Sequence, residues 1–214
     1  IAEVVSQQGW KFLRGGAFKP RTSPYSFQGL EEEGLKILSR VAQKFNLLSV
    51  SEVLSPEDVF LVSEYVDILQ IGSRNSQNFP LLKKVGKISK PILLKRGMMM
   101  RLEEFVLAAE YIADSGNPNI ILCERGIRTF ETATRNTLDL SAIPYLKEKT
   151  KLPIIVDPSH ASGHASYVIP LSKAALACGA DGLMLEVHPN PKQALSDAEQ
   201  SLDLDAFKAF AKQI

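Results

Sequence analysis

The sequence predicts an α/β fold of the (β/α)8 or TIM barrel type, and three observations lead to this prediction. Seven short apolar runs recur along the chain of 214 residues, and such continuous runs are typical of strands buried on both faces of a parallel sheet. Amphipathic helical patterns separate the runs, as in repeated βαβ units. Polar or charged residues follow nearly every run. A doubly wound open sheet gathers ligand residues at one crevice, whereas a closed ring directs all its strand ends to one mouth.

The seven predicted strands each end beside a short polar or charged segment. In chain order the strands are "WKFL" (10–13), "LLSV" (47–50), "ILQIG" (68–72), "PILLK" (91–95), "NIILC" (119–123), "LPIIVD" (152–157) and "GLMLEV" (182–187). The segments at their ends are "RGG", "SEV", "GSRN", "KRG", "ERG", "DPSH" and "EVH". We therefore expect the functional residues to lie in these segments.

The helix over residues 30–45 has the clearest amphipathic pattern. Acidic residues fill its first turn and Lys44 lies in its last turn, as the helix dipole favours. Its predicted buried face, at spacings of three and four, consists of Leu30, Gly34, Ile37, Leu38, Val41 and Phe45.

Two further helices have capping signals. In the segment "SPED", Ser55 is the expected N-cap, Pro56 the first helical residue and Asp58 the residue that reaches back. The segment "RLEEFVLAAEYIADSG" is expected to end at Gly116.

The first residues, "IAEVVSQQG", predict the tail of a helix that ends at Gly9. A barrel helix follows a strand, so we expect the first strand of the barrel, and part of its helix, to lie upstream of Ile1. No linker or change of composition interrupts the chain. We expect residues 1–214 to form a single TIM-barrel catalytic domain that is incomplete at its N-terminus and begins within the first helix.

The overall composition excludes some classes of protein. Hydrophobic residues make up 45% of the chain and the net charge is +1, which argues against a general binder of nucleic acid or of acidic membranes. No run of 18 uncharged apolar residues and no signal-peptide pattern occur, so we expect a soluble, cytoplasmic protein. Cys123 and Cys178 lie in apolar stretches and are expected to be buried, without a disulfide or zinc site.

Basic side chains cluster at the predicted strand ends of this almost neutral chain. The cations on or just past four strand ends are Arg14, Lys19, Arg21, Arg74, Lys95, Arg96, Arg125 and Arg128. Two like charges about 4 Å apart cost roughly 4 kcal/mol at an effective dielectric constant of about 20. We therefore expect an anion pocket for phosphate or carboxylate groups. The alternative is a set of solvated loop charges.

Acidic and imidazole side chains gather towards the C-terminus. Asp157 and His160 follow one predicted strand, Glu186 and His188 are expected on one face of the next strand, and Asp197 follows later. A set of His, Glu and Asp residues can hold a divalent first-row metal ion.

Lys95 allows a different chemistry. A lysine inside a barrel can form a Schiff base with a carbonyl substrate, as in class I aldolases. The neighbouring cations favour the alternative that Lys95 binds phosphate or acts as an acid.

Six blocks in order resemble those of 3-deoxy-D-arabino-heptulosonate 7-phosphate (DAHP) synthases of the short, type Iβ form. They are "RGGAFKPRTSPYSFQG", "QIGSRNSQNF", "LLKRG", "ILCERGIRTFE", "DPSHASG" and "ALSDAEQSL". The resemblance extends from about Gly9 to the end of the chain. The block "DPSH" also occurs in the related 3-deoxy-octulosonate 8-phosphate synthases, in which "KANRSS" replaces "KPRTSP".

The resemblance implies a metal-dependent, aldol-type condensation of phosphoenolpyruvate with erythrose 4-phosphate, the first step of the shikimate pathway of aromatic amino acid biosynthesis. It implies that Arg14 and Lys19 face the phosphoenolpyruvate carboxylate and the reacting carbons. Arg21 and Thr22 are then expected to hold the phosphate of the aldose.

For the phosphoenolpyruvate phosphate, the resemblance implies the side chains of Lys95, Arg74 and Arg125, with the backbones of Ser73 and Glu52 nearby. Lys19 and Lys95 are the candidate proton donors.

The implied cofactor is a divalent metal ion (Mn, Fe, Zn or Co) that acts as a Lewis acid on the aldehyde. Its implied ligands are His160, which is also a candidate catalytic residue, Glu186 and Asp197. The family's fourth ligand is a cysteine in a "GPC" motif at the end of the first strand, upstream of this chain, and neither Cys123 nor Cys178 lies in such a motif.

The implied partners are the two phosphorylated substrates and further copies of the chain, in a homotetramer or homodimer, with no nucleic acid and no membrane. Three alternatives remain open from the sequence. They are an octulosonate-phosphate synthase activity, a Schiff-base aldolase that uses Lys95, and a truncated, inactive barrel that only binds a ligand or a partner chain.

Overall fold

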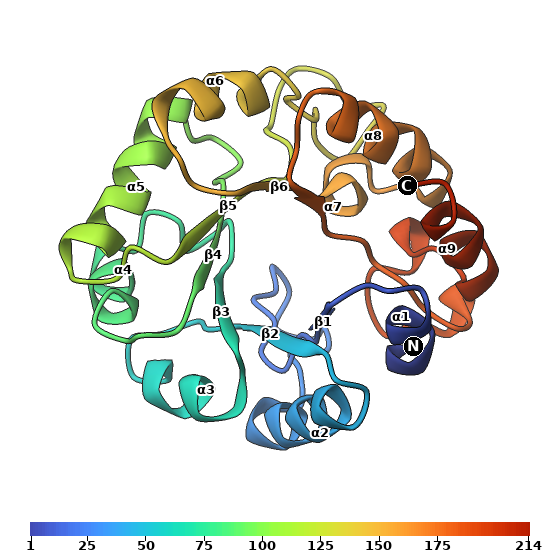
Figure 1. Ribbon diagram of the computed structural model, residues 1–214, viewed down its shortest axis with the longest axis horizontal. Helices are drawn as coiled ribbons and strands as arrows, with labels where there is room; N and C mark the ends of the chain where they lie inside the picture. The colour runs from blue at the N-terminus through green and yellow to red at the C-terminus, as the bar shows by residue number, and fades with distance from the viewer. The chain divides into compact units, whose positions relative to one another are not determined.

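The computed structural model of the chain describes all of residues 1–214 (Figure 1). Its strands are β1 (Phe12–Arg14), β2 (Leu48–Glu52), β3 (Ile68–Ile71), β4 (Ile92–Lys95), β5 (Ile120–Glu124), β6 (Ile154–Val156) and β7 (Gly182–Leu183). Its α-helices are α1 (Ala2–Gln7), α2 (Glu31–Lys44), α3 (Val59–Tyr65), α4 (Phe79–Val85), α5 (Leu102–Asp114), α6 (Ala142–Lys149), α7 (Pro158–Ser162), α8 (Ala165–Ala177) and α9 (Leu204–Ala211). Two 3-10 helices, η1 (Pro191–Gln193) and η2 (Ala198–Gln200), precede α9.

The strands form a parallel sheet whose order follows the chain from β1 to β7. The register places Glu52 of β2 opposite Gln70 of β3. Beyond the end of β4, the amide of Arg96 donates to the carbonyl of Cys123 over 2.9 Å. Sequential parallel strands separated by helices are the pattern of a (β/α)8 barrel, so the predicted fold class is confirmed.

The chain divides into two compact units. One unit consists of Ala2–Leu94 and Leu107–Ile120, and it holds β1, β2, β3 and most of β4. The other consists of Ile1, Lys95–Val106 and Ile121–Ile214, and it holds most of β5 together with β6 and β7.

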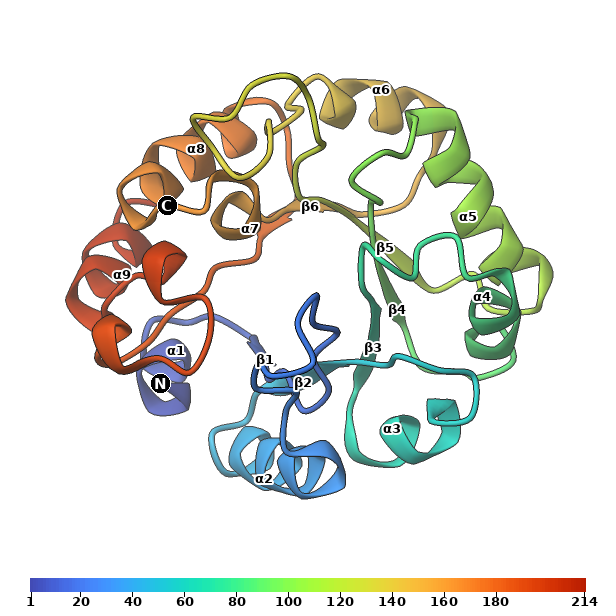
Figure 2. The ribbon, with the colours of Figure 1, turned by 180° about the vertical axis from the view of Figure 1, so that it is seen from behind.

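In the first unit, α2 and α3 lie side by side and contact β2 and β3 (Figures 1 and 2). Leu35 of α2 and Leu69 and Ile71 of β3 are fully buried there. Burial of each such side chain stabilises the fold by about 1.5 to 3 kcal/mol.

In the second unit, α7 and α8 pack against each other, and α8 and α7 both contact η2. Phe207 and Phe210 of α9 are almost completely buried, as is Val156 of β6. Asp203 caps α9 because its side chain accepts a hydrogen bond from the amide of Ala206.

Helix α2 occurs where the sequence predicts it, but its buried face differs. Leu35, Leu38 and Ala42 are buried, whereas Leu30 and Ile37 are 56% and 36% exposed. The predicted and the observed sets both have spacings of three and four, so the periodicity alone is compatible with burial of either of two adjacent helix faces. Contact with the strands selects the face that contains Leu35.

Helix α3 begins at Val59 and not at the predicted Pro56. Ser55 donates its hydroxyl to the Asp58 carboxylate over 2.9 Å, which closes a turn before the helix. The first residues form a helix, α1, and α5 is confirmed with Gly116 beyond its end at a φ of 117°.

The last strand is shorter than predicted. β7 ends at Leu183, so Glu186 and His188 do not share a strand face as expected. Val187 instead makes an isolated parallel bridge with Leu202. His188 accepts a hydrogen bond from the amide of Asn190 at its Nδ1 atom, 3.0 Å away.

The two cysteines differ. Cys123 on β5 is fully buried, as predicted, and burial raises the pKa of its thiol to about 12. Cys178 is exposed, so the prediction was wrong for this residue, which lies at the C-cap of α8 where the helix reaches solvent. None of the helices has both the length and the apolar character needed to cross a lipid bilayer.

Candidate functional site

Lys95, Asp157 and His160 form a buried cluster in the second unit. Lys95 ends β4, Asp157 directly follows β6, and His160 lies in the short helix α7. The Asp157 carboxylate accepts three hydrogen bonds: from the Lys95 ammonium, from the His160 amide over 2.9 Å and from the His160 Nδ1 atom over 2.7 Å. Asp157 is thus the N-cap of α7, followed by Pro158 at the first helical position. The cap therefore fixes the imidazole next to the lysine.

The charges in this cluster depend on one another. Burial alone would raise the pKa of Asp157, but His160 and Lys95 lower it well below its usual value, so the residue is a carboxylate. Burial lowers the pKa of His160 despite the opposing effect of Asp157, so the imidazole is neutral at pH 7. A neutral imidazole that donates from Nδ1 to Asp157 has a free lone pair on Nε2.

Glu186 lies on the Nε2 side of His160. Its Oε1 atom is 3.7 Å from His160 Nε2, and its amide donates a hydrogen bond to the Ser159 hydroxyl over 3.1 Å. Donors that bind one ion at about 2.0 to 2.2 Å are separated by a distance of this order. Imidazole and carboxylate together suit a divalent first-row metal, so this pair fits the predicted cofactor.

Asp197, the third predicted ligand, lies beside different residues. No three His, Cys, Asp or Glu side chains lie close enough to hold a metal ion together. The Oδ1 atom of Asp197 is 3.9 Å from Arg135 Nη1 and 3.4 Å from Gln200 Nε2. Asp197 also has a left-handed backbone, with a φ of 58°. The structure therefore brings together two of the three predicted ligands.

Arg125 follows β5 and is 4% exposed. Its guanidinium donates to the carbonyls of Gly126, at 3.3 Å, and His160, at 3.1 Å. Burial lowers the pKa of Arg125, but an arginine in a protein remains charged. No carboxylate lies within ion-pair distance of it, so its charge is available to an anionic ligand.

Arg96 does not belong to the predicted anion pocket. Its Nη1 atom donates to Glu124 over 2.9 Å and to Asp139 over 2.8 Å, and its Nε atom donates to the carbonyl of Met100 over 3.0 Å. The other Glu124 oxygen accepts the amide of Gly126 at 2.6 Å. Two carboxylates therefore neutralise Arg96, and the expectation that it contributes to an anion pocket was wrong.

In the first unit, Arg14, Lys19, Arg21 and Thr22 lie at the end of β1 and in the loop that follows. The loop is closed by hydrogen bonds from the Lys19 amide to the Gln28 carbonyl, over 2.8 Å, and from Arg21 Nε to the Phe27 carbonyl, over 2.9 Å. Thr22 is exposed, and the three basic residues are partly buried.

Glycine is required where this loop ends. Gly29 has a φ of 106°, and a Cβ atom at this position would lie 2.0 Å from the carbonyl oxygen of Ala17. The close approach ties the end of the loop to its start.

Glu52, Ser73 and Arg74 lie at the ends of β2 and β3. Glu52 is 8% exposed, and its Oε2 atom accepts a hydrogen bond from Gln70 Nε2 over 3.0 Å. A Cβ atom on Gly72 would lie 1.9 Å from the other Glu52 oxygen, so only glycine leaves room for this carboxylate. Arg74 is exposed and Ser73 is partly buried.

Three residues beside the site carry no signal in the sequence. Arg135, Asn136 and Gln200 occur in unremarkable polar runs, and the contacts that matter join positions far apart in the chain. Asp157 does have a signal, because an acidic residue directly before proline is typical of a helix N-cap. A cavity of about 460 Å³ is lined by residues of three segments: Thr132–Arg135, Ser162–His164 and Asp197–Gln200.

Comparison with known proteins adds independent evidence. The DAHP synthetase I family matches residues 1–214 of the chain. The phospho-2-dehydro-3-deoxyheptonate aldolase of Thermotoga maritima is 59% identical over 213 residues, which are 100% of this chain and 63% of that protein. The 2-dehydro-3-deoxyphosphooctonate aldolase of Syntrophotalea carbinolica is 33% identical and is matched over 100% of this chain and 81% of its own length.

Two solved structures have the same fold. The crystal structure of the DAHP synthase from Thermotoga maritima matches with a TM-score of 0.96 and 58% identity over 99% of this chain and 62% of that one. A truncated form of 3-deoxy-D-arabino-heptulosonate 7-phosphate synthase from the same organism matches with a TM-score of 0.92 and 54% identity, over 99% of this chain and 77% of that one. The chain thus spans less than two thirds of the full-length Thermotoga protein.

Proposed function

The chain belongs to the DAHP synthetase I family, and from this membership we propose that it condenses phosphoenolpyruvate with erythrose 4-phosphate to give DAHP and inorganic phosphate. The observation that supports this most is the buried cluster of the second unit. Lys95 and Arg125 provide cationic groups for a phosphate beside a histidine and a carboxylate suited to a metal ion. In the condensation of a phosphorylated enol with an aldehyde, cationic groups can bind the phosphate and a metal ion can polarise the aldehyde.

In the proposed reaction, C3 of phosphoenolpyruvate attacks the aldehyde carbon of erythrose 4-phosphate. A carbon–carbon bond forms, and the aldehyde oxygen takes up a proton. Water then adds at C2 and loses a proton, the bond between C2 and the phosphate oxygen breaks, and inorganic phosphate leaves. The product has a ketone at C2.

We assign the phosphoenolpyruvate phosphate to Lys95, Arg74 and Arg125, with the Ser73 and Glu52 backbones nearby. Guanidinium groups bind phosphate through paired hydrogen bonds, and such charged hydrogen bonds contribute about 1.5 to 3 kcal/mol each. Arg125 suits this role because it is buried and its guanidinium donates to backbone carbonyls and to no carboxylate.

The remaining basic residues of the first unit serve the other groups of the substrates. We assign Arg14 and Lys19 to the phosphoenolpyruvate carboxylate and the reacting carbons. Arg21 and Thr22, in the loop after β1, then hold the aldose phosphate.

We propose that His160, Glu186 and Asp197 hold a divalent ion of Mn, Fe, Zn or Co. When bound, such an ion supplies Lewis-acid polarisation of the aldehyde. Asp157 keeps the His160 imidazole in the tautomer whose Nε2 atom is a ligand. This support comes from the chemistry of the donors and from the 3.7 Å between His160 and Glu186.

Lys95 and Lys19 are the proposed proton donors. A Schiff-base mechanism at Lys95 requires the amine as a free nucleophile, whereas the Lys95 side chain forms an ion pair with the Asp157 carboxylate. The contact with Asp157 therefore favours an acid or phosphate-binding role for Lys95.

The octulosonate-phosphate synthase activity is the second candidate. The block "KPRTSP" in place of "KANRSS" favours the DAHP synthase activity, as does the identity of 59% to the Thermotoga protein against 33% to the Syntrophotalea protein.

A steady-state assay tests the proposal. Purified chain supplied with Mn²⁺, phosphoenolpyruvate and erythrose 4-phosphate is expected to release inorganic phosphate, and arabinose 5-phosphate is expected to support much less release. A chelator is expected to abolish turnover. Phosphoenolpyruvate binding without phosphate release would contradict the proposal and support a barrel that only binds. Trapping of a substrate on Lys95 by borohydride would contradict the metal mechanism.

We also propose that the chain acts in the cytoplasm as a single catalytic domain and assembles into a homotetramer or homodimer. Light scattering coupled to size-exclusion chromatography measures the assembly, and a monomeric mass would contradict this part of the proposal.

A further inference from the structure

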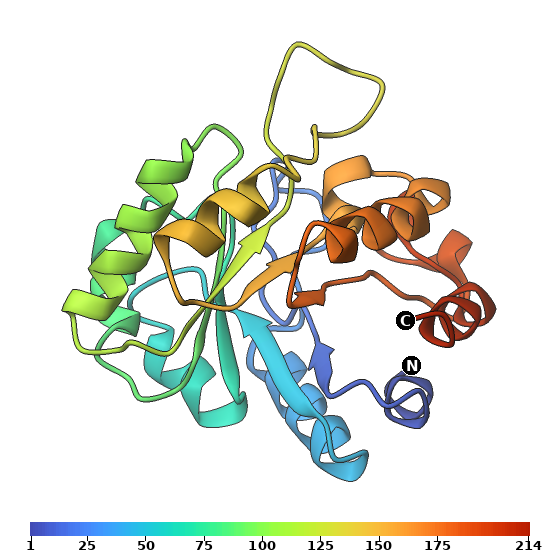
Figure 3. The ribbon, with the colours of Figure 1, turned by 45° about the horizontal axis from the view of Figure 1, so that its top comes forward.

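The loop between β5 and α6 reaches two of the proposed metal ligands. Its ends are joined by hydrogen bonds between the backbones of Ile127 and Thr137, each of 2.9 Å. Between these ends the loop forms an arch that extends away from β5 and α7 (Figure 3). Two adjacent residues near its second end, Arg135 and Asn136, make contacts in different directions.

Asn136 contacts the helix that carries His160. Its Nδ2 atom donates to the carbonyl of His160 over 3.2 Å, and its amide donates to the carbonyl of Ala161 over 2.8 Å. The amide of Arg135 donates to the carbonyl of Ser162 over 3.0 Å. The last carbonyls of a helix have no partner within the helix. The loop therefore supplies the donors that α7, a single short turn of helix, needs at its C-terminal end.

The position of Asn136 is tightly constrained. The side chain is 4% exposed. Gly126 has a φ of 88°, and Asn136 packs closely against it. A Cβ atom added at Gly126 would lie only 2.8 Å from the Asn136 Cβ and 3.1 Å from the Ala161 Cβ. Asn136 is therefore packed between Gly126 and α7, with little space for another side-chain position.

Arg135 acts in the other direction, through Gln200. Its Nη1 atom donates to Gln200 Oε1 over 3.0 Å, and Gln200 Nε2 points to Asp197 Oδ1 at 3.4 Å. Gln200 is 3% exposed. The arginine can bond only to the amide oxygen, so it fixes which end of the Gln200 amide faces Asp197.

We propose that this loop braces the metal site, with Asn136 as the positioning residue for His160 and Gln200, oriented by Arg135, as the positioning residue for Asp197. The inference rests on the proposed function, because it takes His160 and Asp197 as ligands. Partners that orient metal ligands typically change the metal affinity by about 10- to 100-fold when they are removed. The two adjacent loop residues would thus link ligands that are far apart in the sequence.

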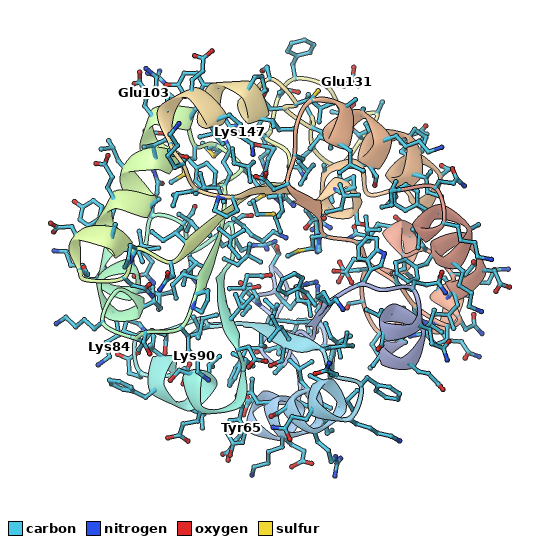
Figure 4. The ribbon with its side chains drawn as sticks, in the orientation of Figure 1. Tyr65, Lys84, Lys90, Glu103, Glu131 and Lys147 are labelled. Carbon is cyan, nitrogen blue, oxygen red and sulfur yellow. The ribbon has the colours of Figure 1, made fainter.

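The test measures Mn²⁺ binding to the metal-free chain by electron paramagnetic resonance of the free ion. Asn136→Leu and Gln200→Met keep the approximate size of each side chain and remove its hydrogen bonds. Each is expected to weaken Mn²⁺ binding by about 10- to 100-fold. The matched control is Glu131→Gln in the same loop. Glu131 is exposed and lies at the margin of the molecule in Figure 4, and its carboxylate accepts from the amides of Thr132 and Ala133. This variant is expected to keep the affinity of the unchanged chain.

A second readout separates positioning from general loss of structure. The visible absorption spectrum of bound Co²⁺ reports the arrangement of its ligands, so both variants are expected to change it, whereas their far-ultraviolet circular dichroism stays the same. Unchanged Mn²⁺ affinity and an unchanged Co²⁺ spectrum in both variants would overturn the inference.

His160→Ala distinguishes this failure from failure of the proposed function. If His160→Ala loses Mn²⁺ but Asn136→Leu and Gln200→Met do not, the metal site is supported and the brace is overturned. If the unchanged chain binds no Mn²⁺, or if His160→Ala binds it as well as the unchanged chain does, both the metal part of the proposed function and the brace are overturned.

Discussion

Lys95 and Arg96 are adjacent in the chain, yet they belong to two buried ion-pair clusters with different properties. Lys95 shares Asp157 with His160. Beside them, the Nε2 atom of His160 faces Glu186, and the guanidinium of Arg125 donates only to backbone carbonyls. Arg96 is bonded to Glu124, to Asp139 and to a backbone carbonyl. Consecutive residues of an extended chain point to opposite faces, which is why neighbours enter separate clusters.

The difference between the clusters shows how to separate function from stability among buried charges. In the Arg96 cluster the charges and hydrogen bonds are satisfied within the protein, so the cluster can stabilise the fold but has little to offer a ligand. The Lys95 cluster keeps a lone pair on His160 Nε2, and the neighbouring Arg125 has no carboxylate within ion-pair distance. We therefore expect changes in the Lys95 cluster to affect turnover and changes in the Arg96 cluster to affect unfolding.

The largest effect is expected from Lys95→Met. If Lys95 donates a proton or binds the transferred phosphate, turnover should fall by about 10²- to 10⁴-fold, the range for loss of a positioned acid. Initial rates of phosphate release measure this. Lys90→Met is the matched control, since the Lys90 ammonium, labelled in Figure 4, donates to the carbonyl of Val66 over 2.6 Å and has no proposed role in the reaction. Equal turnover in the two variants would show that Lys95 has no role in the reaction.

Arg96→Met is expected to have the next largest effect, on stability. It leaves Glu124 and Asp139 without their cation, and removal of one partner from a buried pair costs about 3 to 5 kcal/mol. Urea unfolding measures the free energy. The double variant Arg96→Met with Glu124→Gln should recover part of the loss, because it removes a buried charge. A loss below about 1 kcal/mol, the range of surface pairs, would contradict a structural role.

Arg74→Ala is expected to have a smaller effect, confined to substrate binding. Arg74 is exposed and contributes little to the core, whereas one charged hydrogen bond to phosphate contributes about 1.5 to 3 kcal/mol, or roughly 10- to 100-fold in affinity. Calorimetric titration with phosphoenolpyruvate measures the change, and Arg40→Ala, an exposed arginine of α2, is the control. If the ligand-free variant unfolds at a clearly lower temperature than the unchanged chain, the loss of binding would follow from loss of structure, and Arg74 would have a structural role instead.

The smallest effect is expected at Asp181, which pairs with Lys147 on the surface over 2.6 Å. Burial raises the pKa of Asp181, but the hydrogen bonds from Lys147 and the Ile154 amide outweigh it and lower the pKa overall. A lowered pKa stabilises the folded state above the usual value for Asp, about 3.9, and this contribution disappears as the pH falls through the folded-state pKa.

Asp181→Asn should therefore reduce the free energy of unfolding by less than about 1 kcal/mol at pH 7. The difference from the unchanged chain should stay constant down to about pH 5 and shrink below about pH 4. Urea unfolding at several pH values checks this. A difference that grows in acid would show that Asp181 has a raised pKa.

The strands were predictable because each lies in a continuous apolar run, and all seven overlap the runs that the sequence indicates. The buried face of α2 was not predictable, because the set with Ile37 and the set with Leu35 both have helical spacing. Only contact with β2 distinguishes them. The shortness of β7 was likewise hidden, because "GLMLEV" remains apolar beyond Leu183.

The site was predictable where a residue type and a strand end coincide, as for His160, Lys95 and Arg125. The sequence did not predict that Lys95 and Arg96 point in different directions, because the partners of Arg96, Glu124 and Asp139, are 28 and 43 residues away from it in the sequence. Asn136 and Gln200 were missed for the same reason. An amide that orients a ligand looks like any other polar residue until the fold places it beside one.

The contrast between the two cysteines has a practical consequence. A maleimide reacts with the thiolate of an accessible cysteine, and the inaccessible Cys123, with its pKa of about 12, supplies almost none at neutral pH. A fluorophore or spin label can therefore be attached to Cys178 alone in the unmodified chain, which provides a probe of motion at the end of α8 without any engineered substitution.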